Sequence, residues 1–218
     1  MDANERLIVA LDVPTMPKLR DLVRDLSGAG VRCFKIGIEL LVSNLGPRAI
    51  ECVQAHAGQI MYDAKLCDIP RTMERAVRAA VRQKVSMITI HAANTPEAIR
   101  SAVENRGDAK ILGVTVLTSM GDAQCKWLFG AEVDDQVLKF AHALRDLGVD
   151  GIVCSPREAC LIRSDERFNS MLLVTPGVRP AWDTRVSDQK RTKTPGEAIV
   201  DGVDCIVVGR SITAPPVG

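Results

Sequence analysis

The stretch Gln59-Ile60-Met61-Tyr62-Asp63-Ala64-Lys65-Leu66-Cys67-Asp68-Ile69-Pro70 joins an apolar run to a proline that can open a helix. If residues 59–65 form a strand, Asp63 and Lys65 lie two positions apart and point to the same face. Unpaired charges are rarely tolerated inside a fold, so alternating charges at the end of a strand indicate a charge network that is kept for chemistry. The stretch therefore predicts a strand with a charge network at its end, followed by a helix from Pro70.

Short β-type runs alternate with longer helical patterns from one end of the chain to the other, which is typical of repeated βα units. Eight strands with interleaved helices indicate an α/β fold of the (β/α)8 TIM-barrel type rather than an open sheet. The strands are expected at 7–12, 33–37, 59–65, 87–91, 111–117, 151–154, 171–175 and 205–209. Helices are expected near 16–28, 40–54, 70–83, 95–105, 133–147, 156–163 and 195–201.

Two segments carry the signature of a helix start. Thr95-Pro96-Glu97 and Ser155-Pro156-Arg157-Glu158 each place a hydroxyl at the capping position and proline at the first helical position. After the last predicted strand only residues 211–218 remain, and they are too short and proline-rich for a full helix. We expect the eighth covering helix to be short or absent.

The composition is that of an ordinary globular protein. With 218 residues, 46% of them hydrophobic and 25% charged, the chain is expected to form a single domain over 1–218. A net charge of +1 argues against nucleic acid or an anionic membrane as a partner. No apolar run is long enough for a membrane span and the first residues are unlike a signal peptide, so a cytoplasmic location is expected.

The seven cysteines are scattered, with no Cys-x-x-Cys pair, and are interpreted as free thiols in a reducing compartment. The three histidines lie near no cysteine in the sequence, so a zinc site is the weaker interpretation.

Polar side chains gather where the predicted strands end. Active sites of barrels lie at this carboxyl-terminal face, and packing alone hardly explains so many polar groups there. The residues are Asp12, Lys35, Asp63, Lys65, His91, Thr118 and Arg210.

The segment from Asp63 to Pro70 resembles the signature Asp-x-Lys-x-x-Asp-Ile-Pro of the orotidine 5′-monophosphate decarboxylase family, without a substitution. Further segments resemble that family in the same order, so the resemblance covers nearly the whole chain. They are residues 10–12, 34–37, 116–119, 175–180 and 208–211.

This resemblance implies decarboxylation of orotidine 5′-monophosphate to uridine 5′-monophosphate and CO2 without a metal or organic cofactor. Lys65 matches the lysine that stabilises the developing carbanion and then protonates the ring carbon. Asp63 would face the substrate carboxylate, where two neighbouring anions disfavour the ground state. Asp63 and Asp68 would hold Lys65 charged, and Lys35 extends the alternation to four catalytic charges.

The resemblance also assigns substrate contacts to the loops. Asp12 and Lys35 match residues that bind the ribose hydroxyls, and Thr118 matches a residue that contacts the pyrimidine. Gly209 and Arg210 would bind the phosphate, because glycine lets the backbone approach and arginine supplies charged donors.

Residues 176–194 form a long connection, and loops of this length in compact domains are usually functional. Its charges suggest a cationic lid over the phosphate, in which Arg179 and Gln189 match the family's contact residues. The cations are Arg179, Arg185, Lys190, Arg191 and Lys193, against Asp183 and Asp188.

In the family, the second aspartate of the motif reaches the active site of the neighbouring subunit. By resemblance, Asp68 and Thr72 act in trans, and Ile69 between them belongs to the substrate-binding residues. The implied assembly is a homodimer with shared sites, whose isolated monomer is nearly inactive.

Simpler structural interpretations stay open for several of these residues. Asp12 could cap a helix that begins at 13–14, Lys35 could extend its ammonium to solvent, and Thr118 could cap a turn. His91 is given no role, because a neutral histidine bound by the backbone is as plausible as a catalytic one.

Two other functions compete with the decarboxylase. A Mg-dependent sugar-phosphate decarboxylase or aldolase of the same superfamily would carry a metal-binding acid near the end of the second strand, where Lys35 suits a magnesium site poorly. A non-catalytic nucleotide-binding barrel dimer is the other alternative, although all four charges of the network are retained.

Overall fold

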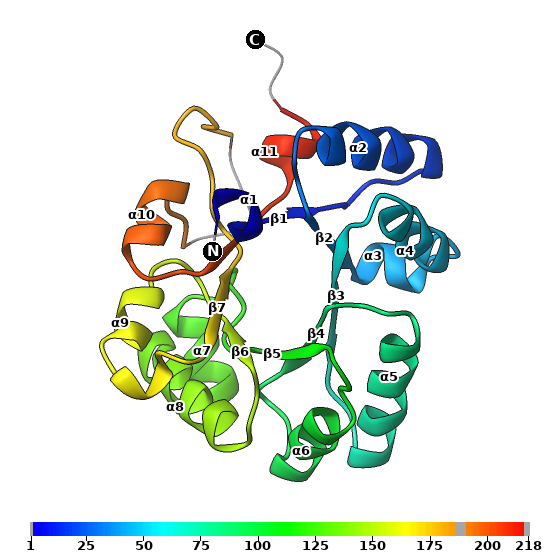
Figure 1. Ribbon diagram of the computed structural model, residues 1–218. Coiled ribbons are helices and arrows are strands. Elements are labelled where there is room, and N and C mark those ends of the chain that lie inside the picture. Colours follow the sequence, from blue (N-terminus) through cyan, green and yellow to red (C-terminus); the bar gives the residue numbers. More distant parts are fainter. Residues whose placement is uncertain (1, 186–190, 216–218) are drawn as a thin grey trace.

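Eight parallel strands close into a barrel in the computed structural model, which describes residues 2–185 and 191–215. Each strand pairs with the next along the chain, and β8 pairs with β1 to close the ring (Figure 1). The predicted (β/α)8 TIM barrel is therefore confirmed. The strands are β1 (Leu7–Ala10), β2 (Cys33–Gly37), β3 (Gln59–Leu66), β4 (Met87–His91), β5 (Lys110–Val114), β6 (Gly151–Val153), β7 (Leu172–Thr175) and β8 (Cys205–Val208).

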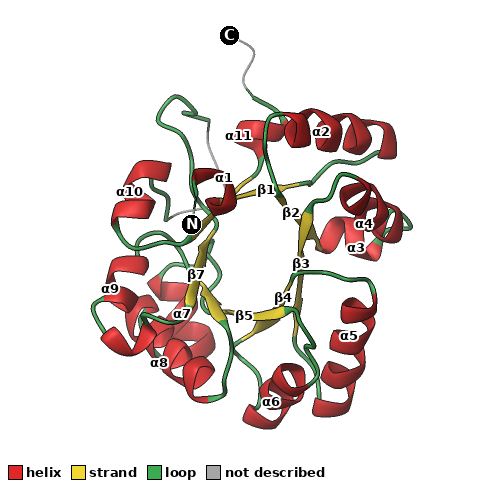
Figure 2. Cartoon of the chain, viewed as in Figure 1, coloured by secondary structure: helices red, strands yellow, loops and turns green. Residues whose placement is uncertain are grey.

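The helices surround the ring of strands (Figure 2). None of those within the described residues is long and apolar enough to cross a membrane. The helices are α1 (Ala3–Arg6), α2 (Met16–Gly28), α3 (Ile38–Val42), α4 (Gly46–Ala55), α5 (Pro70–Arg82), α6 (Pro96–Glu104), α7 (Asp122–Phe129), α8 (Val133–Asp146), α9 (Ala159–Arg163), α10 (Pro195–Val200) and α11 (Arg210–Thr213), with a 3-10 turn η1 (Glu166–Phe168).

One of the two predicted helix starts is confirmed and the other is wrong. The Thr95 side chain caps α6 by accepting a hydrogen bond from the backbone N–H of the third helical residue. The helix predicted from 156 begins only at Ala159. The hydroxyl of Ser155 donates to the carboxylate of Glu158 and accepts from the Arg157 N–H (3.3 Å), and residues 156–158 form a turn.

Other differences from the prediction have local causes. The helix expected over 40–54 is two helices, α3 and α4, because the Ser43 hydroxyl donates to the Leu40 carbonyl (2.8 Å) and accepts from the Leu45 N–H (3.1 Å). Helices α1 and α7 were not predicted, and β5 ends at Val114 rather than 117. The eighth helix is short, as expected, since α11 has four residues.

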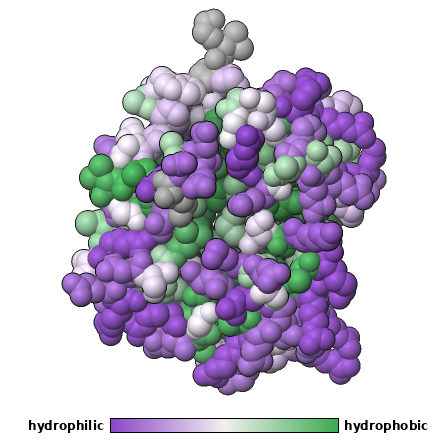
Figure 3. Space-filling model, viewed as in Figure 1, coloured by the Kyte–Doolittle hydropathy of each residue, from purple (hydrophilic) through white to green (hydrophobic). Residues whose placement is uncertain are grey.

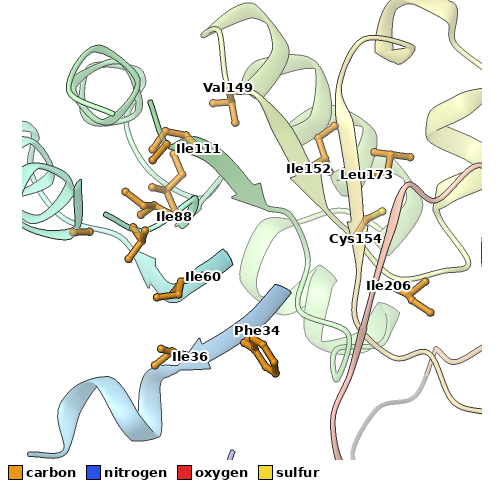
Figure 4. Packing of buried hydrophobic residues seen from close by; sticks show 14 of the residues in the cluster. Phe34, Ile36, Ile60, Ile88, Ile111, Val149, Ile152, Cys154, Leu173 and Ile206 are labelled. Atoms are coloured by element: carbon orange, nitrogen blue, oxygen red, sulfur yellow. The ribbon is translucent and has the colours of Figure 1, made fainter. Parts of the chain in front are cut away.

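Alternation along the strands separates two apolar layers. Ile36, Ile60, Ile88 and Ile111 lie in the layer that packs against the surrounding helices (Figure 4). A second cluster fills the barrel with the intervening residues, among them Ile8, Ala10, Cys33, Met61, Met87, Leu112, Val114 and Val207. Figure 3 shows hydrophobic atoms deep at the centre of this face and mostly hydrophilic residues around them.

The same alternation places charge inside the barrel. On β2 the interior residue Cys33 is followed two positions later by Lys35, and on β3 Met61 is followed by Asp63. The apolar filling therefore ends, near the carboxyl ends of the strands, in a layer of charged side chains.

Candidate active site

A cavity of about 960 Å³ lies at the carboxyl ends of the strands. Its wall combines the last apolar residues of the barrel interior with residues that follow β1, β2, β5, β6, β7 and β8. Of the residues assigned from the sequence, those that line it are Asp12, Lys35, Asp63, Lys65, Thr118, Arg179, Gly209 and Arg210.

Asp63 is the buried centre of the charge network, with 6% of its surface exposed. Its Oδ1 lies 2.8 Å from Lys65 Nζ, and its Oδ2 lies 3.3 Å from Lys35 Nζ. Burial by itself would raise the pKa of Asp63, but Lys35, Lys65 and a hydrogen bond from Thr89 outweigh it and hold this pKa below its ordinary value. Asp63 is thus a carboxylate held between two lysines.

Thr89 of β4 fixes both members of the Asp63–Lys65 pair. Its hydroxyl donates to Asp63 Oδ1 (3.0 Å) and accepts from the backbone N–H of Lys65 (2.8 Å). Lys65 has a positive φ of 47°, and the register between β3 and β4 shifts between Tyr62 and Leu66. A left-handed backbone is uncommon for lysine, so the Thr89 hydroxyl supports a strained position beside the cavity.

Lys35 joins the ends of β1 and β2. Its Nζ lies 3.3 Å from Asp12 Oδ1 as well as contacting Asp63, so its ammonium is held inside the cavity and is not extended to solvent. The N-cap of α2 is Thr15, so Asp12 does not cap that helix. A Cβ at Gly37 would lie 2.7 Å from Lys35 Nζ and 3.0 Å from Asp12 Oδ1, so a side chain there would displace the Lys35 ammonium.

In the described part of the long connection between β7 and α10, the arginine and lysine side chains are paired with carboxylates. Arg179 and Arg185 line the cavity, yet both bind the buried carboxylate of Asp183, with N···O distances of 2.7 and 2.8 Å. Beyond these, Arg191 lies 3.2 Å from Glu158, and Lys193 is paired with Asp201. Arg191 is buried together with Glu158 and is not among the residues that line the cavity.

Asp68, Ile69 and Thr72 are exposed and are not among the residues that line the cavity of their own chain. The Asp68 carboxylate accepts a hydrogen bond from the Ile69 N–H (2.7 Å), and Pro70 opens α5 as predicted. Gln189, Lys190 and Asp188 lie outside the described residues.

His91, at the end of β4, is held by the backbone. Its Nδ1 lies 3.1 Å from the Ala93 N–H and accepts from it. Burial, and then the nearby Lys65, lower the pKa of His91 below its usual value, so the ring is neutral at pH 7.

The sequence profile described as the Orotidine 5'-phosphate decarboxylase / HUMPS family matches residues 5–216. The chain belongs to this family. The match contains every element of the barrel from β1 to β8 and every residue that lines the cavity.

Individual members of the family are similar along nearly the full length. Proteins named orotidine 5'-phosphate decarboxylase from Moorella thermoacetica and Ruegeria pomeroyi are 40% and 41% identical to this chain. Each comparison spans 99% of this chain, with 88% of the Moorella protein and 90% of the Ruegeria protein.

Solved structures agree with the barrel. Orotidine 5'-phosphate decarboxylase from Lactobacillus acidophilus is 30% identical with a TM-score of 0.78, covering 95% of this chain and 91% of its own. An uncharacterized conserved protein from Geobacillus kaustophilus is 28% identical with a TM-score of 0.80, covering 95% and 92%.

Several residues around the cavity of this family member were not singled out from the sequence. Thr89 lies between two isoleucines in an apolar strand, and Ser211 directly follows Gly209 and Arg210. Neither hydroxyl stands out in the sequence. Asp183 and Arg185 are among the charges that the sequence places in the long connection, but their pairing with each other is not predicted. The described residues contain no group of three His, Cys, Asp or Glu side chains that could hold a metal ion.

Proposed function

We propose that this chain is an orotidine 5′-monophosphate decarboxylase, acting in de novo pyrimidine biosynthesis, with residues 1–218 as one catalytic domain. The observation that carries the proposal is the buried carboxylate of Asp63 held between Lys35 and Lys65 in the cavity of a barrel of this family. The relatives of that name, at about 40% identity over nearly the whole chain, support the same substrate.

Lys65 is the group that acts on the reacting carbon. When the bond between the pyrimidine ring and the carboxylate breaks, its electron pair remains on the ring carbon and CO2 leaves. A lysine ammonium fixed 2.8 Å from a buried carboxylate cannot turn freely to solvent, so its charge is preorganised for the carbanion. Lys65 Nζ then gives a proton to the ring carbon, forming uridine 5′-monophosphate.

Asp63 has two effects in this scheme. It positions Lys65, and it places a negative charge where the substrate carboxylate binds, which raises the energy of the bound substrate relative to the transition state. Lys35 and Asp12, joined at 3.3 Å, present a donor and an acceptor to the ribose hydroxyls. Thr118, on the cavity wall, contacts the pyrimidine.

The phosphate lies between the β7 and β8 loops. Arg179, Gly209 and Arg210 line this part of the cavity, where an arginine pair and a glycine backbone suit a phosphate dianion. Gln189 is assigned to the same subsite by the family resemblance alone.

The active protein is a homodimer in which Asp68, Ile69 and Thr72 complete the cavity of the neighbouring subunit. This arrangement is compatible with the exposure of Asp68, Ile69 and Thr72, which do not line the cavity of their own chain. The seven cysteines are free thiols, which fits the reducing cytoplasm.

One observation favours the metal-dependent alternative. Glu39, two residues after β2, lines the cavity and is an acid near the position where such relatives bind magnesium. Lys35, on β2, places a positive charge in that part of the cavity, which disfavours a divalent cation.

Ultraviolet absorbance of orotidine 5′-monophosphate, followed with purified protein, tests the proposal. We expect loss of the substrate chromophore at the same rate with and without EDTA. No loss of the chromophore would refute the decarboxylase, and a rate abolished by EDTA and restored by Mg²⁺ would favour the metal-dependent alternative.

A further inference from the structure

Asp183 is a buried carboxylate beside the proposed phosphate subsite that the decarboxylation mechanism does not use. Only 1% of its side chain is exposed, yet it lies on the wall of the cavity. Its Oδ1 accepts from Arg179 Nη2 (2.7 Å) and Arg185 Nε (2.8 Å), and its Oδ2 accepts from Arg185 Nη2 (2.8 Å) and the Ser211 hydroxyl (2.5 Å). Both oxygens are therefore satisfied by partners from two different loops.

Most of the side-chain N–H groups of Arg185 donate hydrogen bonds within the protein. Besides its two bonds to Asp183, it donates from Nη1 to the Ala214 carbonyl (2.7 Å) and from Nη2 to the Arg210 carbonyl (3.2 Å). A guanidinium has five N–H groups, so four of them are engaged within the fold. Arg185 therefore connects the loop after β7 to the segment after β8 through hydrogen bonds to both.

Arg179 is held differently. Its Nη2 donates to Asp183, and its Nη1 donates to the Arg185 carbonyl. These two bonds fix the plane of the guanidinium and leave its other N–H groups for a ligand, since Arg179 lines the cavity. Two arginines against one carboxylate also leave this cluster with a net positive charge.

The cluster connects the two sides of the proposed phosphate subsite. Ser211 and the Arg210 carbonyl belong to the start of α11, just after β8, whereas Arg179, Asp183 and Arg185 belong to the loop that follows β7. A subsite made from two loops is preorganised only if the loops keep a fixed separation.

We propose that Asp183 is a positioning residue for phosphate recognition, which aligns Arg179 and joins the β7 loop, through Arg185 and Ser211, to the Gly209–Arg210 segment. This inference rests on the proposed function for the identity of the ligand. It adds to that function two residues, Asp183 and Arg185, that act through the phosphate-binding groups.

A competing interpretation makes the opposite prediction. If Asp183 occupied Arg179 as an internal substitute for the phosphate, removing its charge would free the arginine and tighten the binding of phosphate compounds. If Asp183 positions Arg179, removing its charge weakens that binding. The sign of the change therefore decides between them.

The test compares inhibition constants of uridine 5′-monophosphate and uridine for the wild type, Asp183→Asn and Arg185→Gln. We expect both variants to weaken inhibition by uridine 5′-monophosphate by about tenfold or more, the value of one charged hydrogen bond, and to leave uridine nearly unchanged. Asp201→Asn is the matched control, because it breaks an ion pair with Lys193 at the other end of the same connection and does not line the cavity. It should leave both constants unchanged.

Three results would overturn the inference: tighter binding of uridine 5′-monophosphate by Asp183→Asn, an equal loss for uridine, or wild-type constants in both variants. If Asp183→Asn does not fold, Arg185→Gln still tests the connection between the two segments. Wild-type turnover of orotidine 5′-monophosphate is measured separately, and its absence would refute the proposed function. In that case calorimetry would still test the positioning role, by measuring the affinities of the variants for uridine 5′-monophosphate, uridine and inorganic phosphate.

Discussion

Asp63, Lys65 and Thr89 form a small group whose geometry depends on one irregular strand position. The positive φ of Lys65 turns its N–H to the Thr89 hydroxyl, and that hydroxyl also reaches the carboxylate of Asp63. A left-handed backbone conformation costs of order 1 kcal/mol of conformational free energy for a residue other than glycine, so contacts around Lys65 must hold it in place. The Thr89 hydroxyl is one of these contacts.

Thr89→Val keeps the shape of the side chain and removes both hydrogen bonds. We expect the turnover number to fall roughly 10- to 100-fold, because a hydrogen bond to a charged group is worth about 1.5–3 kcal/mol. Thr89→Ser keeps the hydroxyl and should stay close to the wild type. Equal rates for the valine and serine variants in the absorbance assay would contradict this role.

Acid stability should depend on Asp63. Its pKa is lowered in the folded protein, so its stabilising contribution is present above the unfolded value of about 4 and is lost as the pH falls through the folded value. Urea unfolding between pH 5 and pH 3 should lose stability more steeply in the wild type than in Asp63→Asn, by at most about 1.4 kcal/mol per pH unit. Parallel curves would show that the Asp63 pKa is the same in both states.

The pairing of Asp63 with Lys65 can be predicted from the sequence, but the contact of both residues with Thr89 cannot. The alternation of β3 predicts that Asp63 and Lys65 share a face, and their distance of 2.8 Å confirms it. The contact with Thr89 depends on the register shift between β3 and β4, which no local pattern in either strand encodes. A single hydroxyl between apolar neighbours does not identify its partner.

At the scale of elements, the connection from β7 to α10 is tied to the barrel at both ends. Asp183 binds it to the start of α11, just after β8. At the other end Arg191, 8% exposed, contacts Glu158 and donates to the carbonyls of Val116 (3.2 Å) and Leu117 (3.0 Å), just before Thr118. The loop is thereby anchored on either side of residues 186–190.

Arg191→Met should destabilise the protein by roughly 3–5 kcal/mol, because Glu158 would then remain buried without its charged partner. The double variant Arg191→Met/Glu158→Gln should recover part of that loss. Urea unfolding measures both, and Glu132→Gln, which breaks the exposed pair with Lys126, is the control that should scarcely change stability. If the double variant were no more stable than Arg191→Met, the buried charge would not be the cause.

The length of this connection could be predicted from the sequence, but the partners of its cations could not. Contacts between Arg191 and Glu158, or between Asp183 and Ser211, join segments that come together only when the barrel closes. The wrong helix start at 156 has a similar origin, because Glu158 binds Arg191, which is distant in the sequence, as well as the neighbouring Ser155.

In the whole molecule, Lys35, Asp63 and Lys65 line the cavity of the chain. Asp68 lies exposed outside that cavity. The proposed homodimer brings Asp68 to the cavity of the other subunit. Each active site would then depend on residues from two chains.

Mixing two inactive variants tests this sharing. Lys65→Ala and Asp68→Ala should each be inactive alone. If subunits exchange at random, half of the dimers are mixed and each mixed dimer has one intact site, so activity should return to about a quarter of the wild-type value. A mixture as inactive as its components, with exchange confirmed by tagged subunits, would contradict action of Asp68 in trans.

In the proposed mechanism, Lys65 carries out the decarboxylation of orotidine 5′-monophosphate. Its most direct measurement is the ultraviolet absorbance of that substrate with the wild type and with Lys65→Ala, whose fold is verified by circular dichroism. We predict loss of the chromophore with the wild type and a rate at least about a thousandfold lower for the variant, since both the fixed charge and the proton donor are removed. A folded Lys65→Ala protein that converts the substrate at the wild-type rate would contradict the account.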